Sequence, residues 1–127
     1  MRENEARPVA HPPVRVVDKP WGREDWLAVG DRVVLKRLVV EQGHRLSLQY
    51  HRQKEEAWIV LAGRARVTLG ERRGEIGPGD VVHVRPGTVH RIEAIERLEI
   101  LEASTPELDD VVRVEDDFGR SGGKEER

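Results

Sequence analysis

Short runs rich in Val, Leu and Ile recur along the chain, and Gly, Pro or Asp stands at most of the breaks between them. Such runs, repeated roughly every 8 to 12 residues with turn residues between them, are typical of an all-β sandwich or barrel. We expect strands at residues 14–18, 24–29, 32–40, 45–51, 57–63, 65–70, 80–84, 90–95 and 97–103. Helix is expected only from Ser104 to Glu107, where Ser-Thr-Pro-Glu resembles a capping box with Pro at the first helical position, enough for one short turn.

The length of 127 residues fits a single domain. Residues 1–12 are polar and proline-containing, and residues 121–127 are small and charged. Neither segment can bury enough apolar surface to offset the entropy lost on ordering it. We therefore expect flexible tails at 1–12 and 121–127, and one folded domain at 13–120.

The charges are balanced, with 22 basic and 24 acidic side chains and a net charge of −2. The basic residues are scattered, so no nucleic-acid partner is expected. No apolar run approaches the ~20 residues that span a bilayer, and the N-terminus lacks the apolar stretch of a secretory signal, so we expect no membrane partner and a cytoplasmic location. The chain has no Cys, which excludes disulfides, thiolate metal sites and cysteine nucleophiles. A small-molecule substrate and a metal held by N and O ligands remain possible.

Four polar residues in two regions have the chemistry of metal ligands. Side chains alternate along a strand, so Gln49 and His51 share one face of the strand at 45–51. Glu56 opens the next strand, and a hairpin that folds back would bring it to His51. His90 heads a later strand after Arg-Pro-Gly. Taken alone, Gln49 and His51 would equally suit a polar strand face turned to solvent.

The spacing of the first ligand group resembles a known motif. Gly43, five residues, Gln49, one residue, His51, four residues, Glu56, six residues and Gly63 follow the order of the first motif of the cupin superfamily. The usual form of that motif has histidine where this chain has Gln49. The resemblance implies a small double-stranded β-helix, the jelly-roll barrel of cupins.

A second stretch resembles the second cupin motif. Gly79, five residues, Arg85, Pro86, Gly87, two residues and His90 follow its order. Arg85 stands at the place of the usual first proline, and Ala94 stands where asparagine is expected. Two motifs in order, at a separation that suits a small bacterial cupin, make the resemblance fairly specific.

Further segments narrow the resemblance to type II mannose-6-phosphate isomerases, whose cupin domain lies at the C-terminus of bifunctional enzymes that also make GDP-mannose. The similar segments are residues 19–24, 34–40, 46–51, 56–70, 86–93 and 109–120. The resemblance implies a divalent metal held by Gln49, His51, Glu56 and His90. This chain also departs from the family pattern. That family commonly shows histidines and an arginine around the glutamate, where this chain has Arg52, Gln53, Lys54 and Ala57.

A metal with these ligands keeps positive charge and open positions, so it would act as a Lewis acid in an aldose-ketose isomerisation of a sugar phosphate. Zinc is expected first, and manganese, nickel, cobalt or iron would suit the same ligands. Candidates for the base are Lys54, Lys36 and Glu55. Candidates for contact with the substrate are Ser47, Trp58, Arg45 and Arg91, and Lys54 is a further cation for the phosphate.

Two other functions stay open. The same barrel could hold a sugar or another small ligand without turnover, as a metal-dependent binding or sensing module. The absence of the family's further histidines and arginine around Glu56 favours that function. An iron dioxygenase is disfavoured, because oxygen-activating cupins more often use histidine in the place of Gln49.

The remaining features have simpler interpretations. His11, His44 and His83 fall outside the motifs and are expected at the surface. Lys36 and Arg37 point to opposite faces of one strand, so at most one of them enters the barrel. Trp21 and Trp26 are expected to pack under the N-terminal strands. The acidic run 107–117 is expected to be a solvated surface segment.

A homodimer is also expected. Leu46, Leu48 and Tyr50 lie on the strand face opposite the candidate ligands. The N-terminal strands at 14–18 and 24–29 look able to add to a sheet edge. Cupins commonly pair in this way.

Overall fold

The structure is a computed structural model, and it describes residues 8–120. This part of the chain contains strands and no helix. The strands are β1 (Arg15–Lys19), β2 (Gly22–Val29), β3 (Val34–Val40), β4 (Leu48–Tyr50), β5 (Glu56–Ala62), β6 (Ala65–Leu69), β7 (Arg72–Ile76), β8 (Val81–Val84), β9 (His90–Ala94), β10 (Leu98–Ser104) and β11 (Val112–Glu115). The all-β prediction is confirmed.

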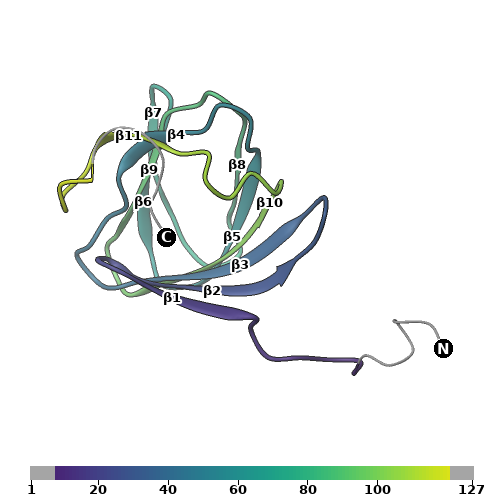
Figure 1. The fold of residues 1–127 in the computed structure, drawn as a ribbon. Coiled ribbons are helices and arrows are strands. Elements are labelled where there is room, and N and C mark those ends of the chain that lie inside the picture. The colour runs from purple at the N-terminus through teal and green to yellow at the C-terminus, as the bar shows by residue number, and fades with distance from the viewer. Residues whose placement is uncertain (1–7, 121–127) are drawn as a thin grey trace.

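The strands form two antiparallel sheets that enclose a barrel (Figure 1). The six-stranded sheet has the order β1, β2, β3, β10, β5, β8, and the five-stranded sheet has the order β11, β4, β9, β6, β7. Segments far apart in the sequence therefore become neighbours. In particular, β11 pairs with β4 and β10 lies between β3 and β5.

The interior follows from side-chain alternation along each strand. On β10, Leu98 and Ile100 are fully buried and Glu102 continues the same inward face. Val60 and Ile92 meet them from the other strands of the apolar core. The apolar residues fill one part of the barrel, and the inward positions of the remaining part carry charged and polar side chains. This second part holds the site described below.

Glycine ends the strand that carries the first motif. Gly63 has a φ of +88°, and a Cβ at this position would stand 2.1 Å from the backbone oxygen of Arg97. Only glycine fits such a close approach of two backbones in the left-handed region. The turn between β5 and β6 therefore depends on this motif glycine.

Two strands, β7 and β11, were not predicted from the sequence. The β7 sequence, RRGEI, has no apolar alternation, and four of its five residues are exposed at the edge of the sheet. The β11 strand lies inside the acidic run 107–117, so the prediction that this whole run is a solvated surface segment is wrong. Val111 and Arg113 of this run are buried at 6% exposure each.

The predicted helical turn from Ser104 to Glu107 is also wrong. Ser104 is the last residue of β10, and the Thr105 backbone nitrogen donates to the Glu55 carbonyl. The Thr105 hydroxyl accepts a hydrogen bond from the Glu55 backbone nitrogen at 3.0 Å. These contacts with a distant loop hold the segment extended, and they outweigh its local capping signal.

The segment before β1 has no strand from residue 8 to residue 12, and the predicted tails at 1–12 and 121–127 stay predictions, because residues 1–7 and 121–127 lie outside the described residues. Within the described range, no helix is long and apolar enough to cross a membrane.

Candidate metal centre and the pocket around it

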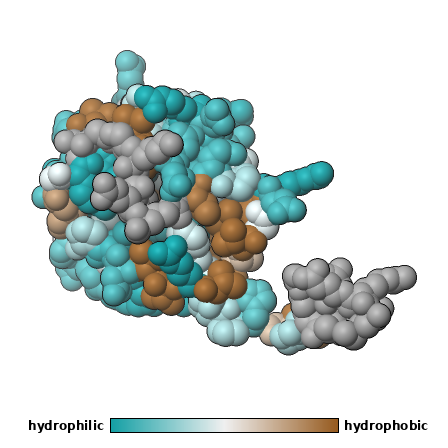
Figure 2. All heavy atoms as spheres, viewed as in Figure 1, coloured by the Kyte–Doolittle hydropathy of each residue, from teal (hydrophilic) through white to brown (hydrophobic). Residues whose placement is uncertain are grey.

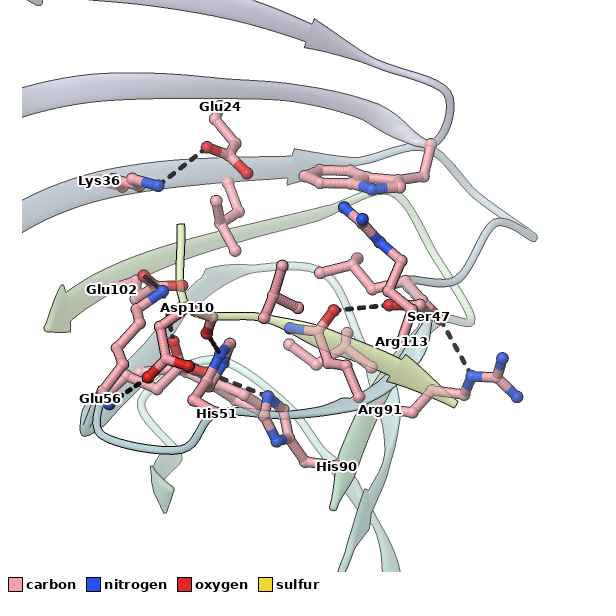
Figure 3. Close-up of a pocket in the computed structure, with 18 of the residues that line it drawn as sticks. Glu24, Lys36, Ser47, His51, Glu56, His90, Arg91, Glu102, Asp110 and Arg113 are labelled. Carbon is pink, nitrogen blue, oxygen red and sulfur yellow. Dashed lines mark hydrogen bonds and ion pairs between the residues drawn. The ribbon is translucent and has the colours of Figure 1, made fainter. Parts of the chain in front are cut away.

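The polar part of the barrel forms a pocket between the two sheets. Its walls come from β2, β3, β4, β5, β9, β10 and β11 and from the loops after β4 and β10. Figure 3 shows Glu56, Glu102, His51 and His90 on one side of this pocket and Ser47 and Arg113 on the other. The residues at each side have different chemistry.

Three of the four predicted ligands converge in the structure. His51, Glu56 and His90 are 3%, 4% and 3% exposed, and each offers one ligand atom within 4.8 Å of the other two. The Nε2 atoms of His51 and His90 lie 3.5 Å and 3.2 Å from the same carboxylate oxygen, Oε1 of Glu56. Glu56 therefore meets His51 as expected, but the expected hairpin is wrong, because β4 and β5 lie in different sheets and the two side chains meet across the barrel.

The hydrogen bonds of the two imidazoles define which nitrogen is available. His51 Nδ1 lies 2.5 Å from the Asp110 carbonyl oxygen, and His90 Nδ1 lies 2.8 Å from the Thr88 carbonyl oxygen. A carbonyl only accepts, so each Nδ1 carries the proton and donates it. In the neutral ring, Nε2 then presents its lone pair, and neither Nε2 makes a hydrogen bond in the described part of the chain.

Two imidazole lone pairs and a carboxylate oxygen facing one another at these distances fit a bound cation. Without one, the two Nε2 lone pairs and Oε1 of Glu56 would face one another with no hydrogen-bond donor between them. A carbonyl that holds the Nδ1 proton of a ligating histidine is also the usual support of a metal site. The residues present therefore suit a divalent metal with N and O ligands.

Gln49 lies beside this triad. It is the direct cross-strand partner of His90 on β9 and of Arg113 on β11. Its side-chain oxygen accepts a hydrogen bond from the Ser47 hydroxyl at 2.6 Å, and both residues line the pocket. The structure therefore brings Gln49 to the centre, and its role as a fourth ligand stays a prediction.

A chain of buried charges continues from Glu56. Lys54 Nζ lies 3.2 Å from Oε2 of Glu56 and 3.5 Å from Oε2 of Glu102. Burial opposes the charge on Lys54, but the Glu102 and Glu56 carboxylates raise its pKa above the ordinary value. Burial also opposes ionisation of Glu56, but the Lys54 ammonium beside Oε2 holds the pKa of this carboxyl well below its usual range. Lys54 is thus a cation, and Glu56 is an anion.

Glu102 belongs to the same chain and was missed by the sequence interpretation. It is 5% exposed, and burial together with the negative charge of Glu56 raises its pKa above the ordinary value. The signal was present in the sequence, because Glu102 stands two residues after Ile100 and four after Leu98 on one strand face.

A second ion pair lies deeper in the barrel. Lys36 Nζ contacts Glu24 Oε1 at 3.0 Å and stands 4.7 Å from the centre of the Trp26 ring. Arg37 binds Asp25 on the other face of the sheet. The expectation that at most one of the two basic residues enters the barrel is met, and Lys36 is the one that enters.

Asp110 fastens the loop that carries His51 and Lys54. Its carboxylate accepts hydrogen bonds from the backbone nitrogens of Arg52, Gln53 and Lys54 at 3.0, 2.6 and 2.9 Å. Its own carbonyl accepts the His51 proton. The acidic run thus closes the pocket and orients a ligand. Sequence reasoning missed this role because the two partners are 59 residues apart.

Arginines gather at the other side of the pocket. Arg91, Arg113 and Arg120 line it, and Arg113 and Arg120 were not among the predicted residues. Arg91 donates from Nε to the Leu46 carbonyl at 3.0 Å, and Arg120 binds the Asp116 carboxylate through Nε and Nη2. This side of the pocket carries positive charge close to Ser47 and Gln49.

Two predicted residues lie outside the pocket. The Glu55 side chain is 43% exposed and contacts His83 on the outer surface, at 2.5 Å. Arg45 forms a two-pronged, exposed ion pair with Asp117. Lys36, Lys54, Ser47, Trp58 and Arg91 do line the pocket. Trp58 is 2% exposed and packs against both the core and His90.

Sequence comparison places this chain beside known proteins. The profile of the family described as mannose-6-phosphate isomerase C-terminal matches residues 7–116. The mannose-1-phosphate guanylyltransferase ManC of Salmonella typhimurium is 37% identical over 111 residues, which cover 84% of this chain and 23% of ManC. The chain therefore spans about a quarter of the length of this relative.

Solved structures show the same fold. KdgF from a Halomonas species superposes with a TM-score of 0.67 at 18% identity, covering 72% of this chain and 87% of that one. An RmlC-like cupin from Shewanella frigidimarina superposes with a TM-score of 0.67 at 14% identity, covering 72% and 83%. The predicted cupin fold is confirmed.

Proposed function

This chain belongs to the mannose-6-phosphate isomerase C-terminal family, and from that membership and its pocket we propose that it is a metal-dependent isomerase of a sugar phosphate. The observation that carries the proposal is the triad of His51, Glu56 and His90, whose available lone pairs converge on one point. A divalent ion, zinc first, would be held there by the triad and by Gln49.

When bound, the ion supplies Lewis acidity that draws electrons from a carbonyl oxygen of the substrate. The chain supplies the rest. Glu56 and the two imidazoles provide one negative charge in all, so a divalent cation in the pocket retains positive charge. Trp58 forms an apolar wall, and the barrel limits access of water to the reacting atoms.

The opposite side of the pocket suits the phosphate. Arg91 and Arg113 line the pocket on the same side as Ser47. A guanidinium group can donate two parallel hydrogen bonds to two oxygens of one phosphate. Arg45 is engaged with Asp117 at the outer surface, so the structure favours Arg113 in the role expected of Arg45. A substrate that spans the pocket would place its carbonyl end at the triad and its phosphate at the arginines.

The test is a coupled assay of mannose 6-phosphate and fructose 6-phosphate with the full chain. Interconversion should stop after chelation and return with added divalent metal. Glu56→Gln should keep the fold and lower turnover by at least about 100-fold, because it alters the charge at the metal. Unphosphorylated mannose and fructose are the control substrates. They should be converted more slowly, because they lack the phosphate that the arginines would bind.

The alternative is a barrel that binds a sugar or another small ligand without turnover. The observation that favours it is the loop after β4. Arg52 and Gln53 are exposed there and do not line the pocket, so Lys54 is the residue of 52–54 that lines it and could act on a substrate. Metal-loaded protein that binds sugar phosphates and converts none of them would establish this alternative.

A further inference from the structure

The pocket contains a carboxyl group that the metal triad does not use. Glu102 extends inward from β10, is 5% exposed and lines the pocket. Its Oε2 is buried without a hydrogen-bond partner among the described residues, and Lys54 Nζ lies 3.5 Å away. A buried oxygen without a hydrogen bond lowers the free energy of unfolding, so its retention in a folded protein suggests a functional role.

The groups that face Glu102 come from every neighbouring strand. Its cross-strand partners are Lys36 on β3 and Trp58 on β5. Lys54 links it to Glu56, and Glu24 on β2 lies behind Lys36. Glu102 therefore sits one side chain away from the candidate metal triad, because the Lys54 ammonium contacts both the Glu102 and the Glu56 carboxylates.

An aldose-ketose isomerase needs one group that takes a proton from carbon and gives it back. Such a group works best when its affinity for the proton is raised toward the working pH. Burial and the neighbouring Glu56 charge raise the pKa of Glu102 in this sense. A buried carboxyl with a specific charged partner inside a pocket is a candidate for such a group.

The three residues predicted as bases are less suited to this task. Lys54 holds its proton between two carboxylates, so it has no free electron pair. Lys36 is bound to Glu24 at 3.0 Å. Glu55 contacts His83 on the outer surface and does not line the pocket. Among the residues predicted as bases, none has the position that Glu102 has.

We propose that Glu102 is the catalytic base and acid that moves the proton between C1 and C2 of the sugar phosphate. This inference rests on the proposed isomerase function. Lys54 is a positioning residue, which holds the Glu102 carboxylate toward the triad.

The proposed step is balanced. The Glu102 carboxylate takes the proton from C2 of the open-chain aldose, the C–H electron pair becomes the C1–C2 double bond, and the carbonyl π electrons move to O1. The O2 hydroxyl proton passes to O1, Glu102 returns its proton to C1, and the C2–O2 bond becomes the carbonyl of the ketose. One proton is taken and one is returned, so no oxidant or reductant is needed.

The experiment is solvent isotope exchange. Metal-loaded full-length protein is incubated with fructose 6-phosphate in D2O, and NMR follows deuterium at C1 and the formation of mannose 6-phosphate. Glu102→Gln should lower both rates by at least about 100-fold. Bound metal, measured by elemental analysis, and circular dichroism should match the wild type.

Glu99→Gln is the matched control, because Glu99 lies on the same strand and faces the opposite side of the sheet. It should leave both rates unchanged. Glu102→Asp keeps a carboxyl group and should exchange deuterium at an intermediate rate, with the acidic limb of the kcat/KM pH profile displaced. This second variant carries the test if the Gln variant does not fold.

The outcomes separate the two proposals. If the wild type interconverts the sugars and Glu102→Gln stays within roughly threefold of it, Glu102 is not the base and the isomerase function stands. If Glu102→Gln loses its metal, or Glu99→Gln loses as much activity, the role of Glu102 is structural and the inference is overturned. If metal-loaded wild type neither exchanges deuterium nor converts any sugar phosphate, both proposals are overturned together.

Discussion

The imidazole of His51 donates its Nδ1 proton to the backbone carbonyl of Asp110, which lies 59 residues away in the sequence. This bond directs Nε2 toward Glu56 and His90. The orientation of a candidate metal ligand in the first half of the domain therefore depends on a residue near its end.

Loss of either histidine should remove the metal. His51→Ala and His90→Ala should each bind metal at least about 100-fold more weakly than the wild type, because a triad reduced to two protein groups is a poor site. Elemental analysis of protein purified without chelator measures this, with His44→Ala as the control outside the pocket. Full retention of metal in both variants would contradict the site.

Replacement of the amide ligand should be tolerated. Gln49→His should keep or tighten metal binding, because imidazole is a stronger ligand than a neutral amide, and its metal preference is expected to change. Competition between zinc and manganese, followed by elemental analysis, measures the preference. If the variant binds metal with unchanged affinity and preference, Gln49 is not a ligand.

The Asp110 carboxylate should stabilise the fold in a pH-dependent way. Burial opposes its ionisation, but three backbone N–H groups hold the pKa of Asp110 below its ordinary value. Its stabilisation is therefore complete above the unfolded-state pKa and disappears as the pH falls through the folded-state pKa. Asp110→Asn should lower the free energy of unfolding by about 1 kcal/mol at neutral pH.

Urea unfolding across a pH series tests this prediction. The difference between the wild type and Asp110→Asn should close as the pH falls below about 4, where the carboxylate of the wild type becomes protonated. Asp31→Asn, in the exposed turn between β2 and β3, is the control. A difference that is the same at all pH values would show that the charge of Asp110 does not act on the loop.

Lys54 should matter for stability as well as for the pocket. Lys54→Met leaves Glu56 and Glu102 buried without their shared cation, so it should destabilise metal-free protein by about 3–5 kcal/mol. The double variant Lys54→Met with Glu102→Gln removes one of the two carboxylates and should recover part of the loss. Urea unfolding of the metal-free proteins measures both, and a single variant as stable as the wild type would contradict the buried charge chain.

The homodimer remains a prediction, and the structure indicates where to test it. Val14 and Val16, next to and within the edge strand β1, are 58% and 57% exposed, and apolar residues gather in the region of β1 and β2 on the face that Figure 2 shows. Light scattering at micromolar concentration should give twice the chain mass. Val16→Lys should shift the protein to monomer, whereas Val114→Lys on β11 should not, and a monomeric wild type would refute the prediction.

The sequence by itself determined nine of the strands and indicated all three members of the candidate metal triad. Period-two alternation identified nine of the strands within a few residues, because each buries one face and exposes the other. Gly63 and Gly79 marked turns that need a positive φ. The spacing from Gln49 to Glu56 allowed His51 and Glu56 to meet, although they do so between the two sheets and not across a hairpin.

The tertiary structure alone decided which charges enter the pocket. Glu102, Asp110 and Arg113 were missed as pocket residues. Alternation along β10 places Glu102 on the inward face, but it does not show which group balances the charge there. Two of them have partners far away in the sequence, Lys54 for Glu102 and the loop of residues 52–54 for Asp110, and strand pairing sets Arg113 opposite Gln49. A charge is stable inside a protein only beside a compensating group, and strand pairing across the barrel is what brings these groups together.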